Sequence, residues 1–240
     1  MSPPRSKGAG GGARDGSPVR IVIVDDHPLV REGLAARIST APGFEICGQA
    51  AGVEEARTVI AATAPTLVVL DLALHDGHGL DLIKRIRGSR PDLKILIVSA
   101  FDETMYAERA LRAGAQGYVN KREVSGAILE AIRTVLRGDL YLSPAMSQRL
   151  AQQAIGSRSH RQGVDALSDR ELEVMSMIGA GRSTREIAAA LHLSPHTIES
   201  HREKIRQKLG LRNGTELVQY AVQWTLQIEA RRNGDSAGGD

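Results

Sequence analysis

The segment from Val19 to Arg137 alternates short apolar runs, rich in β-branched residues, with longer runs of helical periodicity, and the alternation occurs five times. Right-handed crossovers place each helix over the sheet that its neighbouring strands form. The pattern therefore predicts a parallel sheet with helices on both faces. The expected strands are 20–24, 44–50, 67–70, 94–98 and 117–119, and the expected helices are 29–39, 53–63, 80–87, 104–113 and 123–137.

Length and composition exclude several classes of protein. The 240 residues suffice for one or two domains, and a net charge of only +3 does not by itself indicate a polyanionic partner. Cys47 is the single cysteine, which excludes an internal disulfide and is typical of a reducing compartment. No apolar run approaches the roughly 18 residues of a membrane span, and the N-terminus lacks the apolar core of a signal peptide. We expect a cytoplasmic protein without membrane association.

Polar side chains stand where the expected strands end. Asp25 and Asp26 follow the first strand, Asp71 the third and Ser99 the fourth, and Lys121 comes shortly after the fifth. In open α/β sheets this edge binds ligands. Three carboxylates there would raise one another's pKa unless a hard divalent cation lay among them, and Mg²⁺ is the expected ion. A lysine and a hydroxyl beside such a carboxylate suit phosphoryl transfer to it, which depends mainly on positioning and charge neutralisation.

In this order and at these strand ends, the residues resemble the receiver domains of two-component response regulators. The resemblance covers about 20–137 and implies a flavodoxin-like, doubly wound α/β fold with five parallel strands. It implies that Asp71 accepts a phosphoryl group from the phosphohistidine of a sensor histidine kinase. It also implies that Mg²⁺ is held by Asp26, Asp71 and the backbone carbonyl of Ala73, with Asp25 acting mostly through water.

The same resemblance assigns the residues of a conformational switch. Ser99 is similar to the family's switch hydroxyl, Tyr118 to its switch aromatic residue and Lys121 to its invariant lysine. Phosphorylation of Asp71 would draw Ser99 toward the phosphoryl oxygens and turn Tyr118 inward, which shifts the population of a two-state element.

Two positions that flank the phosphoryl group in this family, and tune its hydrolysis, are Ala73 and Phe101 here. Neither side chain offers a polar group to guide a water molecule, so we expect a fairly long-lived acyl phosphate. Following the loss of phosphoryl label from Asp71 with time measures this lifetime. Loss of the label within seconds would contradict the expectation.

The loop after Asp71 departs from the family pattern, because His75 stands where many members have proline. His75 and His78 are two ligands without a third nearby in sequence, which is a poor transition-metal site. We expect both histidines to lie in a solvated loop.

Residues outside the predicted sheet domain divide into tails, a linker and a second domain. Residues 1–18 are rich in Ser, Pro and Gly and are expected to be a disordered tail. In the linker, Ser143-Pro144 is a typical helix start for a helix over 145–155, and the polar segment after it marks a domain boundary. The expected division is receiver 19–138, linker 139–164, second domain 165–229 and disordered tail 230–240.

The second domain is predicted to be an all-α, four-helix unit. Ser168 with Glu171, and Ser183 with Glu186, form capping boxes that start two helices. Ser194-Pro195 starts a third helix only a few residues after the second, which is the tight connection of a helix-turn-helix. Over 195–209 four basic residues stand against two acidic ones, a net charge of +2 that suits phosphate contact.

The fourth helix, over 216–228, is apolar on two sides. One side carries Leu217, Tyr220, Ala221, Trp224 and Ile228, and the other, about 110° away, carries Val218, Val222 and Thr225. One side suffices for the core of the domain. The second is left to cover the linker or the receiver, or to form a dimer contact.

The segment 165–224 is similar to the LuxR-type helix-turn-helix, and the whole chain resembles a NarL/FixJ-subfamily response regulator. The family implies that the helix over 195–208 enters the major groove and that the fourth helix pairs two domains on a palindromic duplex. The implied contacts to bases are Glu199, Ser200, Glu203 and Lys204, and those to phosphates are Thr197, His201, Arg202 and Lys208. Alternatively, some of these charged residues form pairs within the helix and specify nothing.

The sequence thus predicts a regulator of transcription that is phosphorylated on Asp71 and dimerises when phosphorylated. One alternative is a small phosphatase that works through an aspartyl phosphate. It usually has a second acid two residues after the nucleophile, where this chain has Ala73. Another alternative is an atypical regulator that binds DNA without phosphorylation, which the acidic pair, Ser99 and Lys121 disfavour.

Overall fold

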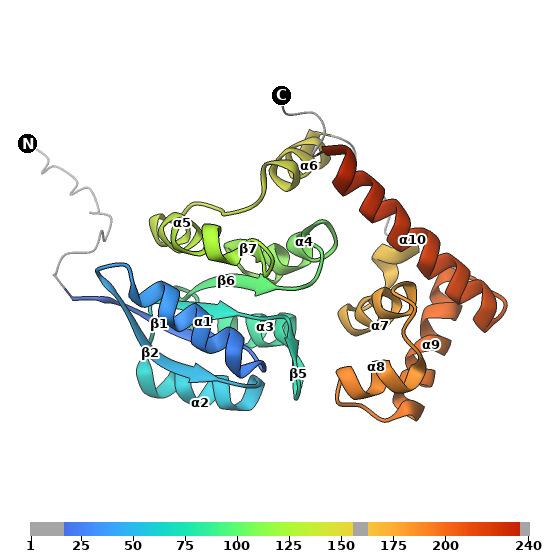
Figure 1. Cartoon of the computed structure of the whole chain (residues 1–240), viewed down its shortest axis with the longest axis horizontal. Helices are drawn as coiled ribbons and strands as arrows, with labels where there is room; N and C mark the ends of the chain where they lie inside the picture. Colours follow the sequence, from blue (N-terminus) through green and yellow to red (C-terminus); the bar gives the residue numbers. More distant parts are fainter. Residues whose placement is uncertain (1–16, 156–162, 236–240) are drawn as a thin grey trace, which may run out of the picture.

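The computed structural model describes residues 17–155 and 163–235. Its sheet consists of β1 (Val19–Val24), β2 (Phe44–Ala50), β3 (Leu67–Leu70), β6 (Lys94–Ser99) and β7 (Gly117–Asn120). These five strands are parallel and lie in the order β2-β1-β3-β6-β7 (Figure 1). The crossover from β2 to β3 over β1 makes the sheet doubly wound, as predicted.

Helices cover both faces of the sheet. The helices are α1 (Pro28–Ser39), α2 (Val53–Thr63), α3 (Gly79–Ser89), α4 (Glu103–Ala113) and α5 (Val124–Arg137). Apolar residues of α1 and α5 pack on one face, and those of α2, α3 and α4 pack on the other. Because β3 is covered on both sides, its four residues are at most 1% exposed, which explains the uninterrupted apolar run in the sequence.

The loop after β3 contains a short hairpin that the sequence did not predict. Its strands are β4 (Ala73–Leu74) and β5 (Gly77–His78). The solvated-loop interpretation was wrong for His78, which is only 6% exposed and whose Nδ1 accepts a hydrogen bond from the Leu80 amide at the start of α3. His75 is exposed, and its Nδ1 lies 2.9 Å from the carbonyl oxygen of Ala51.

The linker first pairs with the sheet and then forms a helix. Tyr141 forms a parallel bridge with Gly117 of β7, and α6 (Pro144–Ile155) follows. The polar segment predicted to be flexible falls largely on 156–162, which lie outside the described residues, as do 1–16 and 236–240.

The C-terminal part is helical, with η1 (Gly163–Ala166), α7 (Asp169–Gly179), α8 (Thr184–Ala190), α9 (Pro195–Leu209) and α10 (Gly214–Asp235). Both capping boxes are formed, and Ser194 caps α9 by accepting from the Thr197 amide. The expected tail after residue 229 is helical as far as Asp235, because α10 continues beyond the apolar pattern that defined its predicted end. None of the helices in the described ranges is long and apolar enough to cross a membrane.

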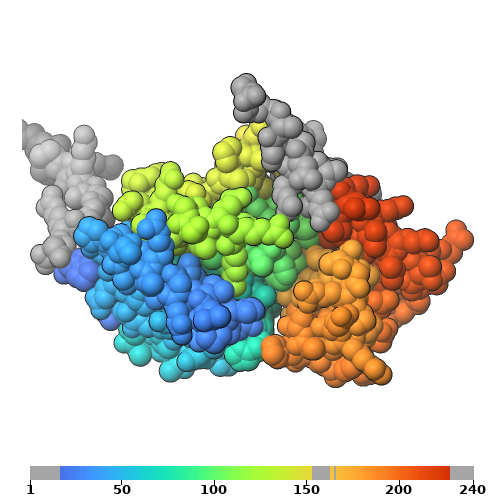
Figure 2. All heavy atoms as spheres, viewed as in Figure 1, coloured from blue at the N-terminus to red at the C-terminus, as the bar shows by residue number. Residues whose placement is uncertain are grey.

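The two lobes are in contact. In the space-filling view the orange residues of α7 and α8 lie against the blue-green part of the receiver (Figure 2). Side chains join the lobes as well, since Arg109 of α4 bonds to Asp169 at the start of α7. The helix-turn-helix is therefore docked on the face of the receiver that carries α3 and α4.

Candidate functional site

Backbone hydrogen bonds fix the polar residues at the strand ends. The Asp71 amide donates to the Val24 carbonyl at 2.8 Å, and the Asp25 amide donates to Ala50 at 3.1 Å. The Lys121 amide donates to the carbonyl of Ser99 at 2.9 Å. These bonds continue the parallel ladders beyond the strands, so the side chains start from a rigid edge.

The structure brings the predicted carboxylates and the lysine together. Lys121 Nζ lies 2.6 Å from Asp71 Oδ2 and 2.6 Å from Asp25 Oδ2. Asp25 is 1% exposed and Asp71 is 3% exposed, so both charges are shielded from water. Asp26 is less shielded, with 16% of its side chain exposed.

Burial and charge shift the titration of this group. Burial raises the pKa of Asp71, with the charge of Asp25 adding to the rise and the ammonium of Lys121 opposing it. Burial alone lowers the pKa of Lys121, but the two carboxylates outweigh it and the pKa lies above its ordinary value. The cluster thus holds three carboxylates and one lysine, which contacts two of them, and the excess negative charge favours a cation.

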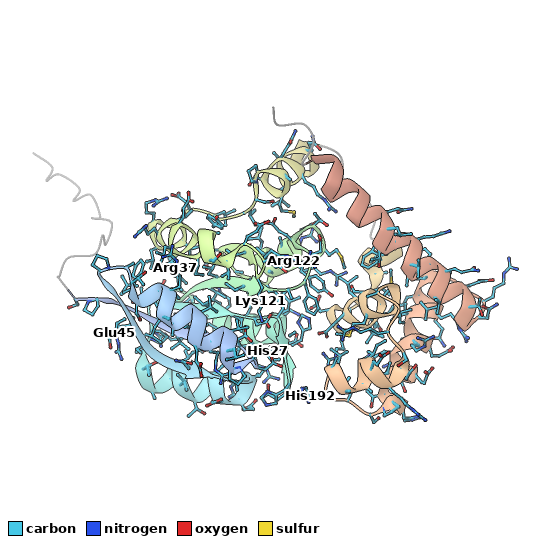
Figure 3. All side chains as sticks on the ribbon, in the orientation of Figure 1. His27, Arg37, Glu45, Lys121, Arg122 and His192 are labelled. Carbon is cyan, nitrogen blue, oxygen red and sulfur yellow. The ribbon has the colours of Figure 1, made fainter. Side chains whose placement is uncertain are left out.

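His27, which is labelled together with Lys121 in Figure 3, is a member of the site that the sequence analysis missed. Its Nδ1 lies 2.6 Å from Asp26 Oδ1 and 3.3 Å from Asp25 Oδ1, and its backbone amide donates to Asp25 Oδ1 at 2.9 Å. Ligand atoms of Asp25, Asp26, His27 and Asp71 all lie within 4.8 Å of one another. The only signal in the sequence was its position between the acidic pair and the first helix, where it is the N-cap of α1.

The donor set fits a hard divalent cation. Asp25 Oδ2 and Asp26 Oδ1 are buried and lack a hydrogen-bond partner, although Lys121 Nζ lies 2.6 Å from the first and His27 Nδ1 lies 2.6 Å from the second. Carboxylate oxygens of this kind are the ligands that Mg²⁺ takes. Ala73 lies beside them, because its amide donates to Asp71 Oδ1 at 3.3 Å. The edge of the sheet is therefore an acidic cluster of the type that holds Mg²⁺ in receiver domains.

The two residues predicted to form the switch, Ser99 and Tyr118, lie next to this cluster. Ser99 and Tyr118 are each 1% exposed, and Tyr118 Oη donates to the Phe101 carbonyl at 2.9 Å. Tyr118 is thus already turned inward, so the inward rotation that we expected on phosphorylation is not available from this state. The Phe101 ring stacks on Tyr106 of α4 with a centroid distance of 4.7 Å.

Helix α9, the predicted recognition helix, exposes part of the side that the sequence assigned to DNA. Ser200 and Lys204 are exposed, whereas the acidic residues have partners within the domain. Glu199 accepts from Thr184 Oγ1 at 2.7 Å and lies 3.6 Å from Arg202 Nε, and Glu203 pairs with Arg206 at 2.6 Å. The pairs within the helix that the sequence left open are therefore present.

Besides Arg202, two candidate phosphate contacts, Lys208 and Thr197, have partners inside the domain, and the remaining one, His201, is partly buried. Lys208 Nζ lies 2.6 Å from Glu171 Oε2, the capping-box residue of α7. His201 is partly buried, its Nδ1 has no hydrogen-bond partner, and burial lowers its pKa. The hydroxyl of Thr197 lies 2.8 Å from that of Ser194. A DNA phosphate would compete with these partners.

The predicted dimer residues of α10 are placed unequally. Val218 is 40% exposed and Val222 is half-buried. Thr225 lies against α7, because a Cβ added to Gly179 would stand 2.1 Å from its hydroxyl oxygen. The opposite side of α10 packs into the core as predicted, with Leu217 and Ala221 at most 1% exposed.

Models of two protein families match the chain. The response regulator receiver domain matches residues 21–133, and the luxR family of bacterial regulatory proteins matches residues 165–221. The first match contains the acidic cluster and the switch residues, and the second contains α7, α8 and α9.

Relatives match over nearly their full length. Oxygen regulatory protein NreC of Staphylococcus carnosus is 36% identical over 214 residues, covering 87% of this chain and 99% of the relative. Response regulator GacA of Pseudomonas aeruginosa is 31% identical over 204 residues, covering 85% of this chain and 95% of the relative. Both domains and the linker are therefore shared with these proteins.

Solved structures of response regulators are similar to this chain as well. A LuxR-family two-component response regulator from Aurantimonas is 35% identical with a TM-score of 0.54, covering 58% of this chain and all of that chain. RcsB of Salmonella typhimurium, at 22% identity, shares the fold with a TM-score of 0.61 over 86% of this chain and 98% of its own. The chain belongs to the NarL/FixJ-type response regulators of two-component systems, with a receiver domain and a LuxR-type helix-turn-helix.

Proposed function

We propose that this response regulator works in the cytoplasm and controls transcription through phosphorylation of Asp71 by a sensor histidine kinase. The observation that carries the proposal is the position of Lys121, 2.6 Å from Asp71 and from Asp25, beside the buried hydroxyl of Ser99. A carboxylate, a cation and a hydroxyl at one strand edge supply what phosphoryl transfer to a carboxylate needs.

The chemistry follows from these side chains. An Asp71 oxygen forms the new bond to phosphorus as the bond from phosphorus to the kinase histidine nitrogen breaks. Lys121 offers its ammonium to the phosphoryl oxygens, and Ser99 offers a hydrogen bond. Mg²⁺, held by Asp25, Asp26, Asp71 and the carbonyl of Ala73, supplies further charge neutralisation when bound. In this proposal the protein catalyses only its own phosphorylation and dephosphorylation and acts on no other substrate.

The output we propose is dimerisation and binding to a palindromic duplex. The exposed Ser200 and Lys204 of α9 are placed to reach base edges. The exposed Val218 of α10, with its neighbour Val222, offers an apolar strip for pairing two DNA-binding domains. In this proposal residues 19–138 form the receiver unit and residues 165–229 the DNA-binding unit.

Labelling with acetyl phosphate and Mg²⁺ tests the proposal. Wild type is expected to take up one phosphoryl group per chain and to dimerise, and Asp71→Asn is expected to do neither, because the amide cannot act as the acceptor. Intact-mass spectrometry and light scattering on the same samples measure both. Asp92→Asn is the matched control, since Asp92 is an exposed carboxylate before β6. An unlabelled wild type, or a labelled Asp71→Asn, would refute the assignment.

A second candidate is a regulator that binds DNA without phosphorylation. The observation in its favour is that the DNA-facing side of α9 is exposed and Tyr118 is already inward in the structure. If Asp71→Asn binds a selected duplex as tightly as phosphorylated wild type does, this candidate replaces the first.

A further inference from the structure

His27 lies between the acidic pair and the first helix of the receiver, and its ring is turned toward the carboxylates. Its Nδ1 lies 2.6 Å from Asp26 Oδ1 and 3.3 Å from Asp25 Oδ1. The ammonium of Lys121 lies at other oxygens, Oδ2 of Asp25 and Oδ2 of Asp71. The imidazole therefore contacts oxygens of the acidic pair that Lys121 does not contact.

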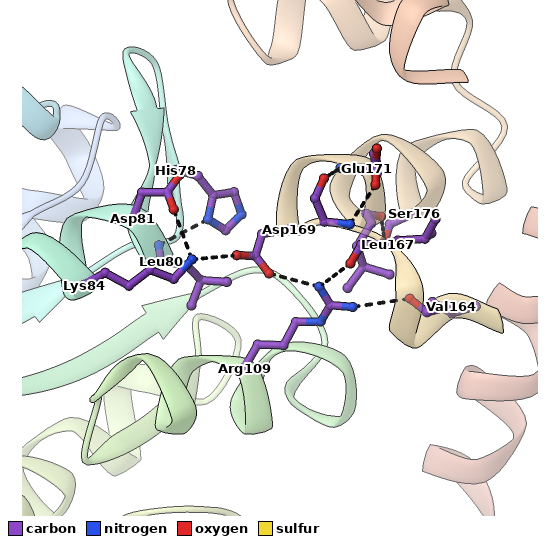
Figure 4. A network of polar contacts seen from close by, with 12 residues as sticks. His78, Leu80, Asp81, Lys84, Arg109, Val164, Leu167, Asp169, Glu171 and Ser176 are labelled. Atoms are coloured by element: carbon purple, nitrogen blue, oxygen red, sulfur yellow. Dashed lines mark hydrogen bonds and ion pairs between the residues drawn. The ribbon is translucent and has the colours of Figure 1, made fainter. Parts of the chain in front are cut away.

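The ring of His27 is not needed to start α1. His27 is the N-cap residue of that helix, but among residues 17–155 its side chain makes no capping hydrogen bond. N-cap positions favour Ser, Thr, Asp and Asn, whose short side chains accept from a backbone amide. His78 shows how a histidine does this in the same domain, because it caps α3 by accepting from the Leu80 amide at 3.2 Å (Figure 4). Capping therefore does not explain why the His27 ring faces the acidic pair.

The spacing of the donor atoms fits one metal ion. Two ligands that lie about 2.1 Å from an ion and at a right angle to each other are about 3.0 Å apart. The distances from His27 Nδ1 to the two carboxylate oxygens, 2.6 and 3.3 Å, lie on either side of that value. Ligands on opposite sides of such an ion are about 4.2 Å apart, and ligand atoms of Asp25, Asp26, His27 and Asp71 all lie within 4.8 Å of one another. Small shifts of the side chains would bring all four onto one ion.

A nitrogen ligand changes which ion the acidic cluster prefers. Mg²⁺ is held by oxygen ligands and keeps several waters. Imidazole nitrogen is instead a common ligand of first-row transition ions such as Fe²⁺, Ni²⁺ and Zn²⁺, which also accept carboxylate oxygens. A neutral imidazole that carries its proton on Nε2 offers the lone pair of Nδ1 to such an ion. Three carboxylates and one imidazole thus suit a transition ion better than three carboxylates do.

We propose that His27 is a nitrogen ligand of the metal ion at this strand edge, and that it raises the affinity of the site for divalent transition ions without raising it for Mg²⁺. The biological meaning of this preference rests on the function proposed above, because the ion neutralises charge during phosphoryl transfer to Asp71. Binding of the ion itself needs no phosphoryl donor. The competing role for His27 is a hydrogen bond to Asp26 that arranges the carboxylates for any divalent cation.

Isothermal titration calorimetry of the unphosphorylated full-length protein, with Zn²⁺ and separately with Mg²⁺, tests the proposal. In His27→Ala the affinity for Zn²⁺ is expected to fall about tenfold or more, since loss of even an indirect partner of a metal ligand costs about 10- to 100-fold. The affinity for Mg²⁺ is expected to stay within about twofold of wild type, because that ion uses the oxygens alone. An equal loss for both ions, or no loss for Zn²⁺, would overturn the proposal.

Two further variants serve as controls for this measurement. His75→Ala removes an exposed imidazole from the hairpin after β3 and is expected to change neither affinity. Asp26→Asn removes a carboxylate of the cluster itself and is expected to weaken the binding of both ions. Zn²⁺ binding that is unchanged in Asp26→Asn would place the ion elsewhere and overturn the proposal. Unchanged Mg²⁺ binding by His27→Ala also shows that this variant keeps a folded site.

Nitrogen-15 NMR of the histidine rings observes the ligand directly. On addition of one equivalent of Zn²⁺ to wild type, the Nδ1 resonance of His27 is expected to move to the range of a metal-bound nitrogen. Mg²⁺ is expected to cause no such change, because it does not bind the ring. A His27 ring that keeps the resonance of a free nitrogen in the Zn²⁺ complex would overturn the proposal.

Failure of this proposal and failure of the proposed function are distinguishable, because the binding experiments contain no phosphoryl donor. If wild type takes no label from acetyl phosphate with either ion, the proposed function fails, while calorimetry and NMR still decide whether His27 is a ligand. If wild type is labelled on Asp71 and His27→Ala binds Zn²⁺ as wild type does, the proposed function stands and His27 is not a ligand.

Discussion

Lys121→Met is expected to slow phosphoryl transfer to Asp71 by about 100-fold or more, the loss that follows removal of one preorganised donor to a developing charge. The ammonium of Lys121 lies 2.6 Å from Asp71 and is the group that meets the incoming phosphoryl oxygens. The initial rate of labelling with acetyl phosphate, followed by intact mass, measures the effect. Lys94→Met is the control, because Lys94 begins β6 at the opposite edge of the sheet.

The same substitution also changes how stability depends on pH. Burial raises the pKa of Asp71, and without Lys121 to oppose it the pKa rises further. A carboxyl whose folded-state pKa is raised binds more protons in the folded state, so its contribution to stability falls as pH rises through that pKa. The melting temperature of Lys121→Met should therefore fall relative to wild type as the pH rises above the ordinary pKa of an aspartate. In the labelling experiment with acetyl phosphate, a rate for Lys121→Met within threefold of the wild-type rate would refute the role of Lys121 in phosphoryl transfer.

Arg170→Met is expected to destabilise the helix-turn-helix by about 3 kcal/mol or more, the usual cost of leaving one member of a buried ion pair alone. Glu173 is fully buried, and its Oε2 lies 2.5 Å from Arg170 Nη1. Arg170 also donates to the Leu191 carbonyl at 2.9 Å, which ties α7 to the turn before α9. Denaturant unfolding followed by the fluorescence of Trp224 measures the loss.

The pH dependence of stability distinguishes two causes of this loss, the unpaired charge of Glu173 and lost packing of the Arg170 side chain. Burial raises the pKa of Glu173, and Arg170 opposes the rise. In Arg170→Met the folded domain should hold the carboxyl proton more tightly, so its stability should fall as pH rises through the raised pKa. Adding Glu173→Gln should recover much of the loss, and Arg185→Met, at an exposed position, should change little. If Arg170→Met lowers the free energy of unfolding by the same amount at all pH values, lost packing alone explains the effect.

Much of the candidate site was predictable because each residue follows a strand that the sequence marks clearly. Asp71 ends a run of four buried apolar residues, and in a parallel sheet such ends share one edge. The helix starts of the second domain were predictable for a similarly local reason. Ser168 and Glu171 cap the same helix start reciprocally and are three residues apart, so the pairing could be predicted without tertiary information.

The features that the sequence did not reveal depend on distant partners. The bond between Arg109 and Asp169 joins residues 60 positions apart, and the sequence around either residue does not indicate its partner. His78 was assigned to a solvated loop because it lies in a polar segment of the sequence, which does not show that its ring stacks on that of Tyr106, from another element, with a centroid distance of 6.4 Å. The inward position of Tyr118 depends on the carbonyl of Phe101 in a neighbouring loop.

The ion pair between Lys208 and Glu171 connects the end of α9 to the first turn of α7. Burial alone would raise the pKa of Glu171, but hydrogen bonds from Lys208 and Ser168 hold it below its ordinary value. A DNA phosphate that attracts Lys208 removes one of these bonds from the first turn of α7, two residues from Asp169. Because a phosphate and Glu171 would compete for one ammonium, binding of DNA at Lys208 would loosen the first turn of α7, and a change that weakens this turn would free Lys208 for DNA. The duplex would thus act as an effector of the protein as well as its target.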